Sequence, residues 1–253
     1  MGISLGKPKL NLGAMMEAKE KIVSGLTGGI DHLFRKNGIT RIEGTGRITA
    51  PGSVVVTTAK GEETLTSDHI LIATGSEATG LKGITIDEKQ IVSSTGALAL
   101  TKVPKRLVVI GAGYIGLEMA TVWRRLGAEV EVVEYLPRIL PGMDQEIATK
   151  FKTILEKDGI SFRLGAAVTS AKTNKSGVVL DLEPAGGGDA EKITADTVLV
   201  AVGRKANTDG LGLDAIGLEL DERGRIPVDE DFETAIPGVY AIGDVIALSL
   251  IHI

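Results

Sequence analysis

The sequence contains no cysteine in its 253 residues. This absence excludes disulfide bonds, thiolate metal sites and a cysteine nucleophile within the chain. The sequence also lacks a basic stripe that would bind nucleic acid, and it has no apolar run long enough to span a membrane. Its start, MGISLGKPKL, lacks the apolar centre of a signal peptide, so we expect a soluble, intracellular protein.

The residues that are present are typical of a globular protein. Hydrophobic residues make up 43% and charged residues 24% of the chain, and the net charge is -5. Glycine is abundant, with 33 residues. A chain of this length can bury roughly 70% of its extended surface, and it is long for one domain but sufficient for two.

The first part of the chain predicts a long helix followed by short strands. Apolar side chains at helical spacing predict a helix over residues 13–36, which Asn37-Gly38 ends. These apolar positions are Met15, Ile22, Leu26, Ile30 and Leu33. Short alternating segments then predict antiparallel strands at residues 39–42, 46–49, 53–58 and 63–66. The apolar run HILIAT, residues 69–74, is typical of a buried strand.

The second part, after Pro104, predicts alternating strands and helices. Strands are expected at residues 106–110, 129–133, 160–164, 167–172, 178–182, 197–202 and 239–242. Helices are expected over residues 111–126 and 144–157. Asp144 is the expected N-cap of the later helix, whose apolar face would comprise Ile147, Phe151, Ile154 and Leu155. This alternation predicts an α/β domain with a mainly parallel sheet.

One motif in this part points to a nucleotide. The stretch VVIGAGYIGLEMA contains a G-x-G-x-x-G pattern formed by Gly111, Gly113 and Gly116. A random chain with this glycine content would show about 0.5 such matches, so the pattern is informative only through its context. Here it follows a predicted strand and opens a predicted helix, and Glu134 ends the next strand.

Each part of this motif has a physical reason. Gly111 allows a tight turn, Gly113 lets backbone amides approach a pyrophosphate, and Gly116 allows close packing of helix and strand. The helix N-terminus supplies free N–H groups and a partial positive charge. Glu134 can accept hydrogen bonds from a ribose 2′-hydroxyl and would repel a 2′-phosphate, which favours NAD over NADP. The alternative is a glycine-rich turn that binds nothing.

Two further strands flank this unit. HILIATGS (residues 69–76) and VYAIGDV (residues 239–245) are both apolar strands that end in polar, glycine-containing residues. As a pair, they suggest that the nucleotide-binding unit is inserted into another domain. Alternatively, both are ordinary strand ends and Asp244 is a solvated turn residue.

Several segments resemble one enzyme family in residues and in order. They are ILIATGS, ITIDEKQIVSSTGALAL, VVIGAGYIGLE, VLVAVGRKANT and GRIPVDEDFETAIPGVYAIGDV. The chain is similar from Gly2 to Ile246 to dihydrolipoyl dehydrogenases, which are flavin-dependent disulfide oxidoreductases with two dinucleotide-binding folds. The resemblance implies an α/β fold in which a Rossmann-like NAD-binding domain (101–225) is inserted into an incomplete FAD-binding domain (1–100 and 226–247).

The resemblance also implies roles for individual residues. NAD would lie against Gly111, Ala112, Gly113, Tyr114, Ile115, Gly116, Leu117 and Glu118, with Ile115 and Glu118 facing the nicotinamide. Glu134 would bind the adenosine ribose, and Val168 and Gly203 would line the NAD site. FAD would contact Gly46, Thr74, Gly75, Ser76 and Asp244, the last through its ribityl chain.

The chain departs from the family in ways that remove its catalytic residues. The family's first G-x-G-x-x-G and its redox cysteine pair would lie upstream of residue 1, and the interface domain with its His–Glu dyad would follow Asp244. His32, His69 and His252 lie in no matching motif, so none is expected to replace the dyad histidine. We therefore expect no catalytic residue and no metal site here, and a fragment that is inactive alone.

The parent protein of such a fragment would be a homodimer acting on a lipoyl-bearing protein. That partner would belong to a 2-oxoacid dehydrogenase or glycine cleavage complex, in bacterial cytoplasm or in the mitochondrial matrix. One alternative is a fragment of another disulfide reductase, such as a mercuric or glutathione reductase, but these typically use NADPH and place basic residues where Glu134 lies. Another alternative is a non-catalytic NAD-binding module.

The final residues, 248–253 (LSLIHI), have no turn, cap or charge. Their back-translation resembles the transposon end used as an adapter in shotgun sequencing libraries. We therefore predict that this tail is adapter-derived and does not belong to the fold. The alternative is a genuine, divergent C-terminus.

Overall fold

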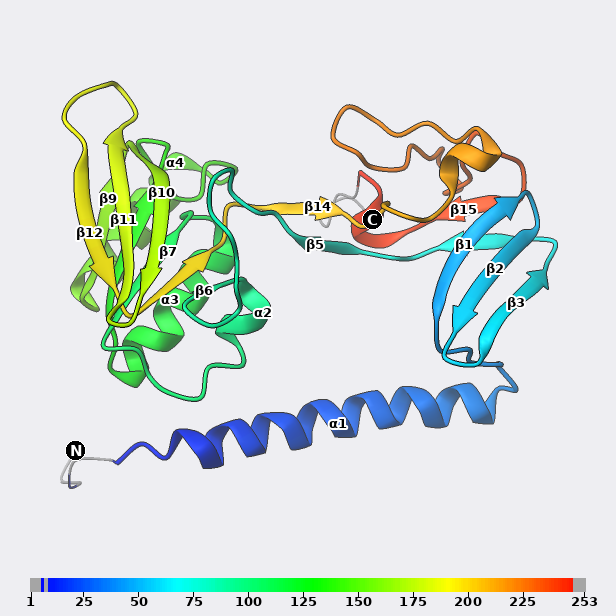
Figure 1. Cartoon of the computed structure of the whole chain (residues 1–253), viewed down its shortest axis with the longest axis horizontal. Helices are drawn as coiled ribbons and strands as arrows, with labels where there is room; N and C mark the ends of the chain where they lie inside the picture. The colour runs from blue at the N-terminus through cyan, green and yellow to red at the C-terminus, as the bar shows by residue number, and fades with distance from the viewer. Residues whose placement is uncertain (1–5, 7–8, 248–253) are drawn as a thin grey trace. The chain divides into compact units, whose positions relative to one another are not determined.

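The computed structural model describes residue 6 and residues 9–247, so the predicted tail at 248–253 lies outside the described residues (Figure 1). The chain divides into two compact units. Unit 1 comprises Met1–Gly29 and Ala78–Gly203, and unit 2 comprises Ile30–Glu77 and Arg204–Ile253. The main segment of unit 1 therefore lies, in sequence, between the two segments of unit 2.

A five-stranded parallel sheet forms the centre of unit 1, in the order β6-β13-β7-β8-β9. Its strands are β6 (Ile91–Val92), β7 (Arg106–Ile110), β8 (Glu129–Glu134), β9 (Ile160–Leu164) and β13 (Thr197–Val200). The middle strands read as nearly continuous apolar runs because both of their faces are buried. The predicted α/β fold with a parallel sheet is confirmed.

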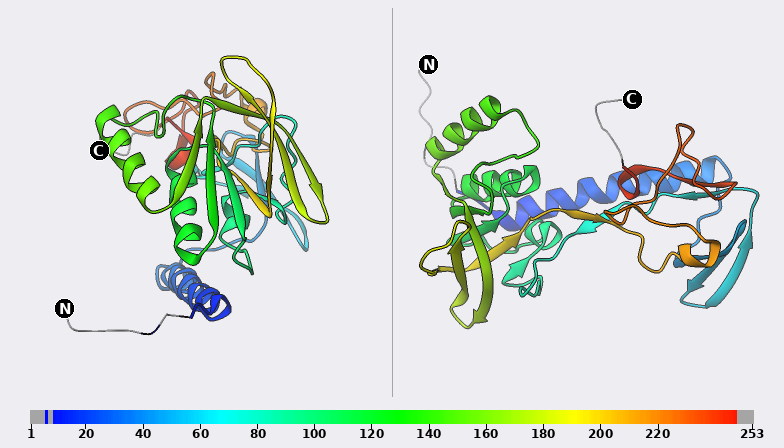
Figure 2. Two further views of the ribbon diagram at one scale, coloured as in Figure 1. Left: turned by 90° about the vertical axis from the view of Figure 1, so that its left-hand side faces the viewer. Right: turned by 90° about the horizontal axis from the view of Figure 1, so that it is seen from above.

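The two faces of this sheet are covered by different elements (Figure 2). The helices α2 (Ser94–Ala97), α3 (Tyr114–Leu126) and α4 (Gln145–Lys157) share a core with side chains such as Val109 and Val132. The antiparallel strands β10 (Ala166–Asn174), β11 (Gly177–Pro184) and β12 (Glu191–Ala195) cover the other face, against side chains such as Val108 and Val133. The side chains of successive residues in one strand thus pack in the cores on opposite faces of the sheet.

The ends of α3 and α4 follow local sequence signals. Gly127 ends α3 in the left-handed conformation, at φ 112°, and its N–H binds the carbonyl of Arg124. Asp144 caps α4 by accepting a 3.1 Å hydrogen bond from the amide of Ile147, as predicted.

The predicted apolar face of α4 is partly wrong. Ile147 and Ile154 are each 55% exposed, whereas Ala148 and Leu155 are buried. Phe151 packs against the same core as the two buried side chains. The face toward the sheet is therefore the stripe of residues 148, 151 and 155, and the two isoleucines lie outside it.

An ionic network crosses three strands of the sheet in unit 1. Glu131 on β8 is only 7% exposed, and its carboxylate binds Arg106 at 2.7 Å and also Arg163 on β9. Arg163 in turn binds Glu191. Burial alone would raise the pKa of the Glu131 carboxyl, but the hydrogen bonds and charges of Arg163 and Arg106 outweigh burial and lower that pKa.

Unit 2 contains an antiparallel meander and a pair of parallel strands. The meander is β1 (Thr45–Ala50), β2 (Ser53–Thr58) and β3 (Gly61–Thr66), and the parallel pair is β4 (Ile70–Ile72) and β15 (Val239–Ala241). A further pair is β5 (Ser76–Ala78) and β14 (Arg204–Ala206), and two short 3₁₀ helices are η1 (Leu213–Ile216) and η2 (Gly243–Val245). The core of unit 2 includes Ile48, Ile70, Ile72, Ile226 and Val239.

Two expectations for this part of the chain need correction, and a third is confirmed. Residues 39–42 form no strand; they follow the turn at Asn37-Gly38 that ends the helix, and Ile39 is 52% exposed. The apolar run at 69–74 is buried on one face only, because Leu71 is 58% exposed while its neighbours Ile70 and Ile72 are buried. The first helix, α1 (Leu12–Lys36), forms as predicted but has no buried residue, so its apolar stripe is exposed.

Candidate functional site

The glycine loop of unit 1 connects the end of β7 to the start of α3. Gly111 has φ 104°, and a Cβ there would lie 2.4 Å from the carbonyl oxygen of Ala201. A Cβ on Gly116 would lie 2.2 Å from the carbonyl oxygen of Gly111. Gly113, by contrast, has nothing within 4 Å of its Cβ position. The tight turn and the close helix packing are therefore present, and the open side lies at Gly113.

The N-terminus of α3 faces this open side with free backbone donors. Gly113 is the N-cap, and because glycine has no side chain, no cap hydrogen bond satisfies the first amides of the helix. The first helical bond runs from the amide of Leu117 to the carbonyl of Gly113, at 3.0 Å. In the described part of the chain, the amides of residues 114–116 donate no hydrogen bond, as expected for the first turn of a helix. Such a turn is suited to a phosphate group.

Glu134 lies beside this loop at the end of β8. One carboxylate oxygen accepts a 2.7 Å hydrogen bond from the amide of Ala112, and the other accepts a 2.9 Å bond from the amide of Leu136. The structure therefore brings together the predicted acid and the glycine motif. It also shows that the amide of Ala112 donates to Glu134 and is not free for a phosphate.

The other residues expected at the NAD site differ in their exposure. Tyr114 and Glu118 are exposed on α3, and Tyr114 is 66% exposed. Ile115 is half-buried, whereas Leu117 and Val168 pack in the cores on the two faces of the sheet. The side chains of the last two are thus buried, and their contact with NAD stays a prediction. Gly203 has φ 144° and its carbonyl accepts a 3.0 Å bond from the amide of Thr79.

An apolar pocket of about 570 Å³ lies beside the first turns of α3. It is lined by Tyr114, Leu117, Glu118, Met119, Thr121, Val122, Leu140 and Phe151. The lining residues of α3 run from Tyr114, the first residue of the helix, to Val122, so the pocket extends along the first two thirds of α3.

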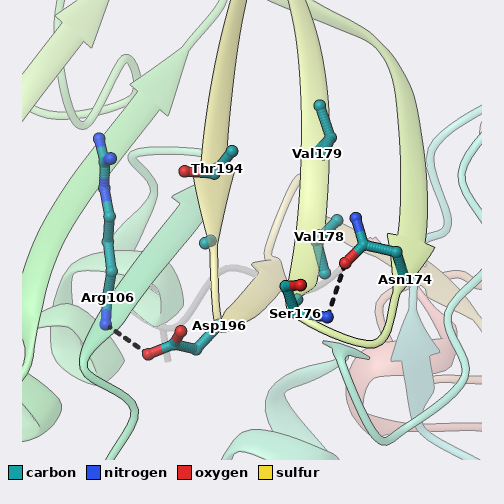
Figure 3. Close-up of a pocket in the computed structure, with 9 residues that line it drawn as sticks. Arg106, Asn174, Ser176, Val178, Val179, Thr194 and Asp196 are labelled. Carbon is teal, nitrogen blue, oxygen red and sulfur yellow. Dashed lines mark hydrogen bonds between the residues drawn. The ribbon is translucent and has the colours of Figure 1, made fainter.

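A second pocket, of about 260 Å³, lies at the amino-terminal end of β7 (Figure 3). It contains Arg106, the first residue of β7, whereas the glycine loop follows the last residue of that strand. Asp196 accepts hydrogen bonds from the amides of Lys105 and Arg106, and Asn174 accepts one from Ser176, so these groups hold turns together. Nucleotides bind at the carboxyl ends of parallel strands, so this pocket is not the nucleotide site.

A cluster of polar groups in unit 2 joins three separate segments. The hydroxyl of Ser76 donates a 2.7 Å hydrogen bond to Asp244, and it accepts a 2.7 Å bond from Nε of Arg204. Arg204 also binds the carbonyl of Ser76. Thr74 donates to the carbonyl of Asn207 at 2.8 Å, and the amide of Asn207 donates to Gly75 at 2.9 Å.

The sequence predicted some members of this cluster and missed others. The Thr74-Gly75-Ser76 turn and Asp244 come together, whereas Gly46 lies in β1 opposite Val56 and does not join the cluster. Arg204 and Asn207 also join the cluster, and no motif predicts a role for them. The segment VGRKANT could have indicated both residues. Polar residues that follow a buried parallel strand lie at the carboxyl end of that strand, where ligands bind.

The described residues hold no group of three or more histidine, aspartate or glutamate side chains suited to a metal ion. Within the same residues, the helices include none that is both long and apolar enough to cross a membrane.

Comparison with known proteins identifies similar sequences over nearly the whole chain. The sequence model of the pyridine nucleotide-disulphide oxidoreductase family matches residues 5–253. The mitochondrial dihydrolipoyl dehydrogenase of Pisum sativum is 52% identical over 246 residues, which are 97% of this chain and 49% of that protein. Dihydrolipoyl dehydrogenase 3 of Pseudomonas putida is 53% identical over 97% of this chain and 52% of its own length. Leghemoglobin reductase of Glycine max is 52% identical over 97% of this chain and 47% of its own length.

Solved structures of flavoprotein disulfide reductases are similar to this chain as well. The Cu(II) complex of the HOCl-induced flavoprotein disulfide reductase RclA from Escherichia coli superposes with a TM-score of 0.84 at 27% identity. This match covers 91% of the present chain and 51% of the RclA chain. The chain thus spans about half the length of the curated relatives it matches.

Proposed function

Because the chain belongs to the pyridine nucleotide-disulphide oxidoreductase family, we propose that it is a fragment of a dihydrolipoyl dehydrogenase. The full-length parent would oxidise protein-bound dihydrolipoamide through a redox disulfide and FAD, with reduction of NAD⁺. The resemblance of nearly the whole chain to dihydrolipoyl dehydrogenases supports this proposal.

We infer that unit 1 holds NAD at the glycine loop. The observation that carries this inference is the open side at Gly113, beside the free amides of the first turn of α3. Those amides would bind the pyrophosphate, and Glu134 would bind the adenosine ribose. A 2′-phosphate would be placed against the Glu134 carboxylate, so the site favours NAD over NADP. When bound, NAD⁺ supplies a hydride acceptor.

We infer that the polar cluster of unit 2 contributes to a flavin site. Asp244 uses one carboxylate oxygen for Ser76, which leaves acceptor sites for a ribityl hydroxyl. Arg204 holds both the hydroxyl and the carbonyl of Ser76, and it adds a positive charge at this position. These donor and acceptor types fit a flavin nucleotide. FAD, when bound, supplies two-electron transfer between the substrate thiols and NAD⁺.

The chain itself lacks the group that would react with the substrate. Dithiol oxidation requires a thiolate that attacks or forms a disulfide, and this chain has no cysteine. We therefore expect no lipoamide activity from the chain alone. In the parent, we expect a homodimer, a lipoyl-bearing protein of a 2-oxoacid dehydrogenase or glycine cleavage complex as partner, and a cytoplasmic or mitochondrial-matrix location.

Calorimetry of the purified chain with NAD and with NADP tests the proposal. We expect NAD to bind and NADP to bind at least about tenfold more weakly, since one misplaced charge costs about 1.4 kcal/mol or more. Equal affinity for the two nucleotides would refute the role of Glu134. Binding to neither would refute the assignment of an NAD site to unit 1. NAD binding by a parent that lacks dihydrolipoamide oxidation would instead favour a non-catalytic NAD-binding module.

A further inference from the structure

The peptide groups on both sides of Ala112 are held by the last residue of β8 and by the segment that follows it. The amide of Ala112 donates a 2.7 Å hydrogen bond to the carboxylate of Glu134. The carbonyl of Ala112 accepts a 3.0 Å bond from the amide of Leu140. Ala112 is completely buried, so water cannot replace either contact. The middle residue of the glycine loop is thus fixed from two directions.

Neighbouring residues of the loop have the same kind of support. The amide of Gly111 donates a 2.8 Å bond to the carbonyl of Val133, the residue before Glu134. Consecutive loop amides therefore bind consecutive residues of β8, first a carbonyl and then a carboxylate. Gly113, the next residue, begins the set of amides that remain free for a phosphate. The position of those free amides depends on how Ala112 is held.

The carboxylate of Glu134 is itself fixed. Its second oxygen accepts a 2.9 Å bond from the amide of Leu136, so the two bonds together set the rotation of the carboxylate. A carboxylate offers about four acceptor sites, so about two remain after these bonds. Two acceptor sites are enough for the hydroxyls of one ribose. Holding the loop and binding the ribose are therefore compatible.

We propose that Glu134 is a positioning residue for the phosphate-binding loop in addition to its role as the ribose acceptor. The carboxylate fixes the peptide of Ala112, and this places the free amides of α3 where a pyrophosphate must lie. The part of the proposal that concerns the nucleotide rests on the proposed NAD site. If Glu134 only binds the ribose, its replacement should leave the conformation of the loop unchanged. A carboxylate that holds the loop would affect the binding of any nucleotide.

The first experiment needs no ligand. Amide hydrogen exchange is measured by NMR on the chain and on Glu134→Gln, which keeps the size of the side chain but removes its charge and puts an amide donor in place of one acceptor. We expect the amide of Ala112 to exchange about tenfold faster, because a charge-assisted hydrogen bond is worth roughly 1.5–3 kcal/mol. Gly111, whose amide binds a backbone carbonyl, is the internal reference and should change much less. An unchanged rate at Ala112 would overturn the proposal.

The matched control is Glu129→Gln on the same strand. Glu129 has a side chain that is 71% exposed, and it lies at the start of β8, away from the loop. This variant should leave the exchange of Ala112 unchanged. If Glu134→Gln does not fold, Glu134→Asp provides the test, because it keeps the charge but is one methylene too short to reach both amides.

The second experiment compares NAD with an analogue that lacks the 2′-hydroxyl of the adenosine ribose. We expect Glu134→Gln to weaken binding of the analogue about tenfold, and binding of NAD by more, because NAD also loses the ribose contact. A loss confined to NAD would show that Glu134 acts on the ribose alone and would refute the positioning role. Failure of the unmodified chain to bind NAD would refute the proposed site, while the exchange experiment would still decide whether Glu134 holds the loop.

Discussion

Replacing Gly116 and Gly113 one at a time should separate packing from nucleotide binding. In Gly116→Ala, the new Cβ would lie 2.2 Å from the carbonyl oxygen of Gly111 and 3.2 Å from Cγ1 of Val109. The first of these atoms is backbone and cannot rotate away. Real Cβ contacts are essentially never shorter than 3.0 Å, so α3 and the loop must separate by at least 0.8 Å, the difference between 3.0 and 2.2 Å.

This displacement should cost stability as well as binding. Overpacking of this kind costs about 1–3 kcal/mol, and each kcal/mol lowers the melting temperature by roughly 2–4 °C for a chain of this size. Gly113→Ala is the matched variant, because its Cβ has nothing within 4 Å and its φ of -75° suits any residue. Its stability should stay within about 0.5 kcal/mol of the original. Its Cβ would still occupy the side from which a phosphate approaches.

Thermal unfolding followed by circular dichroism and calorimetry with NAD provide the two measurements. Gly116→Ala should be less stable and should not bind NAD. Gly113→Ala should keep its melting temperature and lose NAD affinity by about tenfold or more. An unchanged melting temperature in Gly116→Ala would show that the packing argument is wrong. Unchanged NAD affinity in Gly113→Ala would show that phosphates do not approach at this glycine.

Three more outcomes are expected. The chain purified alone should be colourless after gel filtration, and a yellow, tightly flavinated protein would contradict this. Glu131→Gln should lower stability at neutral pH by roughly 2 kcal/mol, since its arginine partners are about a third exposed. The lowered pKa of Glu131 makes this stabilisation complete above the unfolded value of 4.5 and lost as pH falls through the folded value, so urea titrations should show the gap between original and variant closing below pH 4.5. Gly177→Ala should destabilise unit 1, because its φ is +136° and its Cβ would lie 2.2 Å from the carbonyl oxygen of Ala195, whereas Gly28→Ala, with open space around it, should not destabilise the chain in the same melt.

Much of unit 1 could be predicted because its signals are local. The strand at 106–110 has four consecutive apolar residues, Leu107 to Ile110, and the strand at 129–133 has valine at 130, 132 and 133. Gly127 and Asp144 mark helix ends through their own conformation or side chain. β12 was not predicted because only Ile193 and Ala195 of its five residues are buried, which makes the alternation too weak to recognise without its neighbour β11. A two-residue strand such as β6 has no pattern at all.

The candidate site likewise contains features that the sequence predicts and features that it does not. The turn, the helix start and the acid at 134 follow from sequence spacing, because each lies at the end of a recognisable strand. The hydrogen bond between Glu134 and Ala112 could not be predicted, since it depends on how two neighbouring strands end in space. The contact between Arg204 and Ser76 joins residues 128 positions apart, so no local pattern indicates it. The apolar stripe on α1 predicted the helix, but its exposure could not be predicted, because helical periodicity does not reveal whether a face is covered.

The pairing of β4 with β15 has a consequence for the order in which the chain folds during synthesis. Ile70 pairs with Val239, and Ser76 binds Asp244 across 168 positions. The segment Ala78–Gly203, by contrast, contains every strand of the parallel sheet and is complete before residue 204 leaves the ribosome. Unit 1 can therefore fold during translation, while the early part of unit 2 must wait with Ile48 and Ile70 uncovered until the last strand emerges. A ribosome that stalls shortly before residue 239 would hold a complete unit 1 and an incomplete unit 2, which is the stage at which we expect this chain to need a chaperone most.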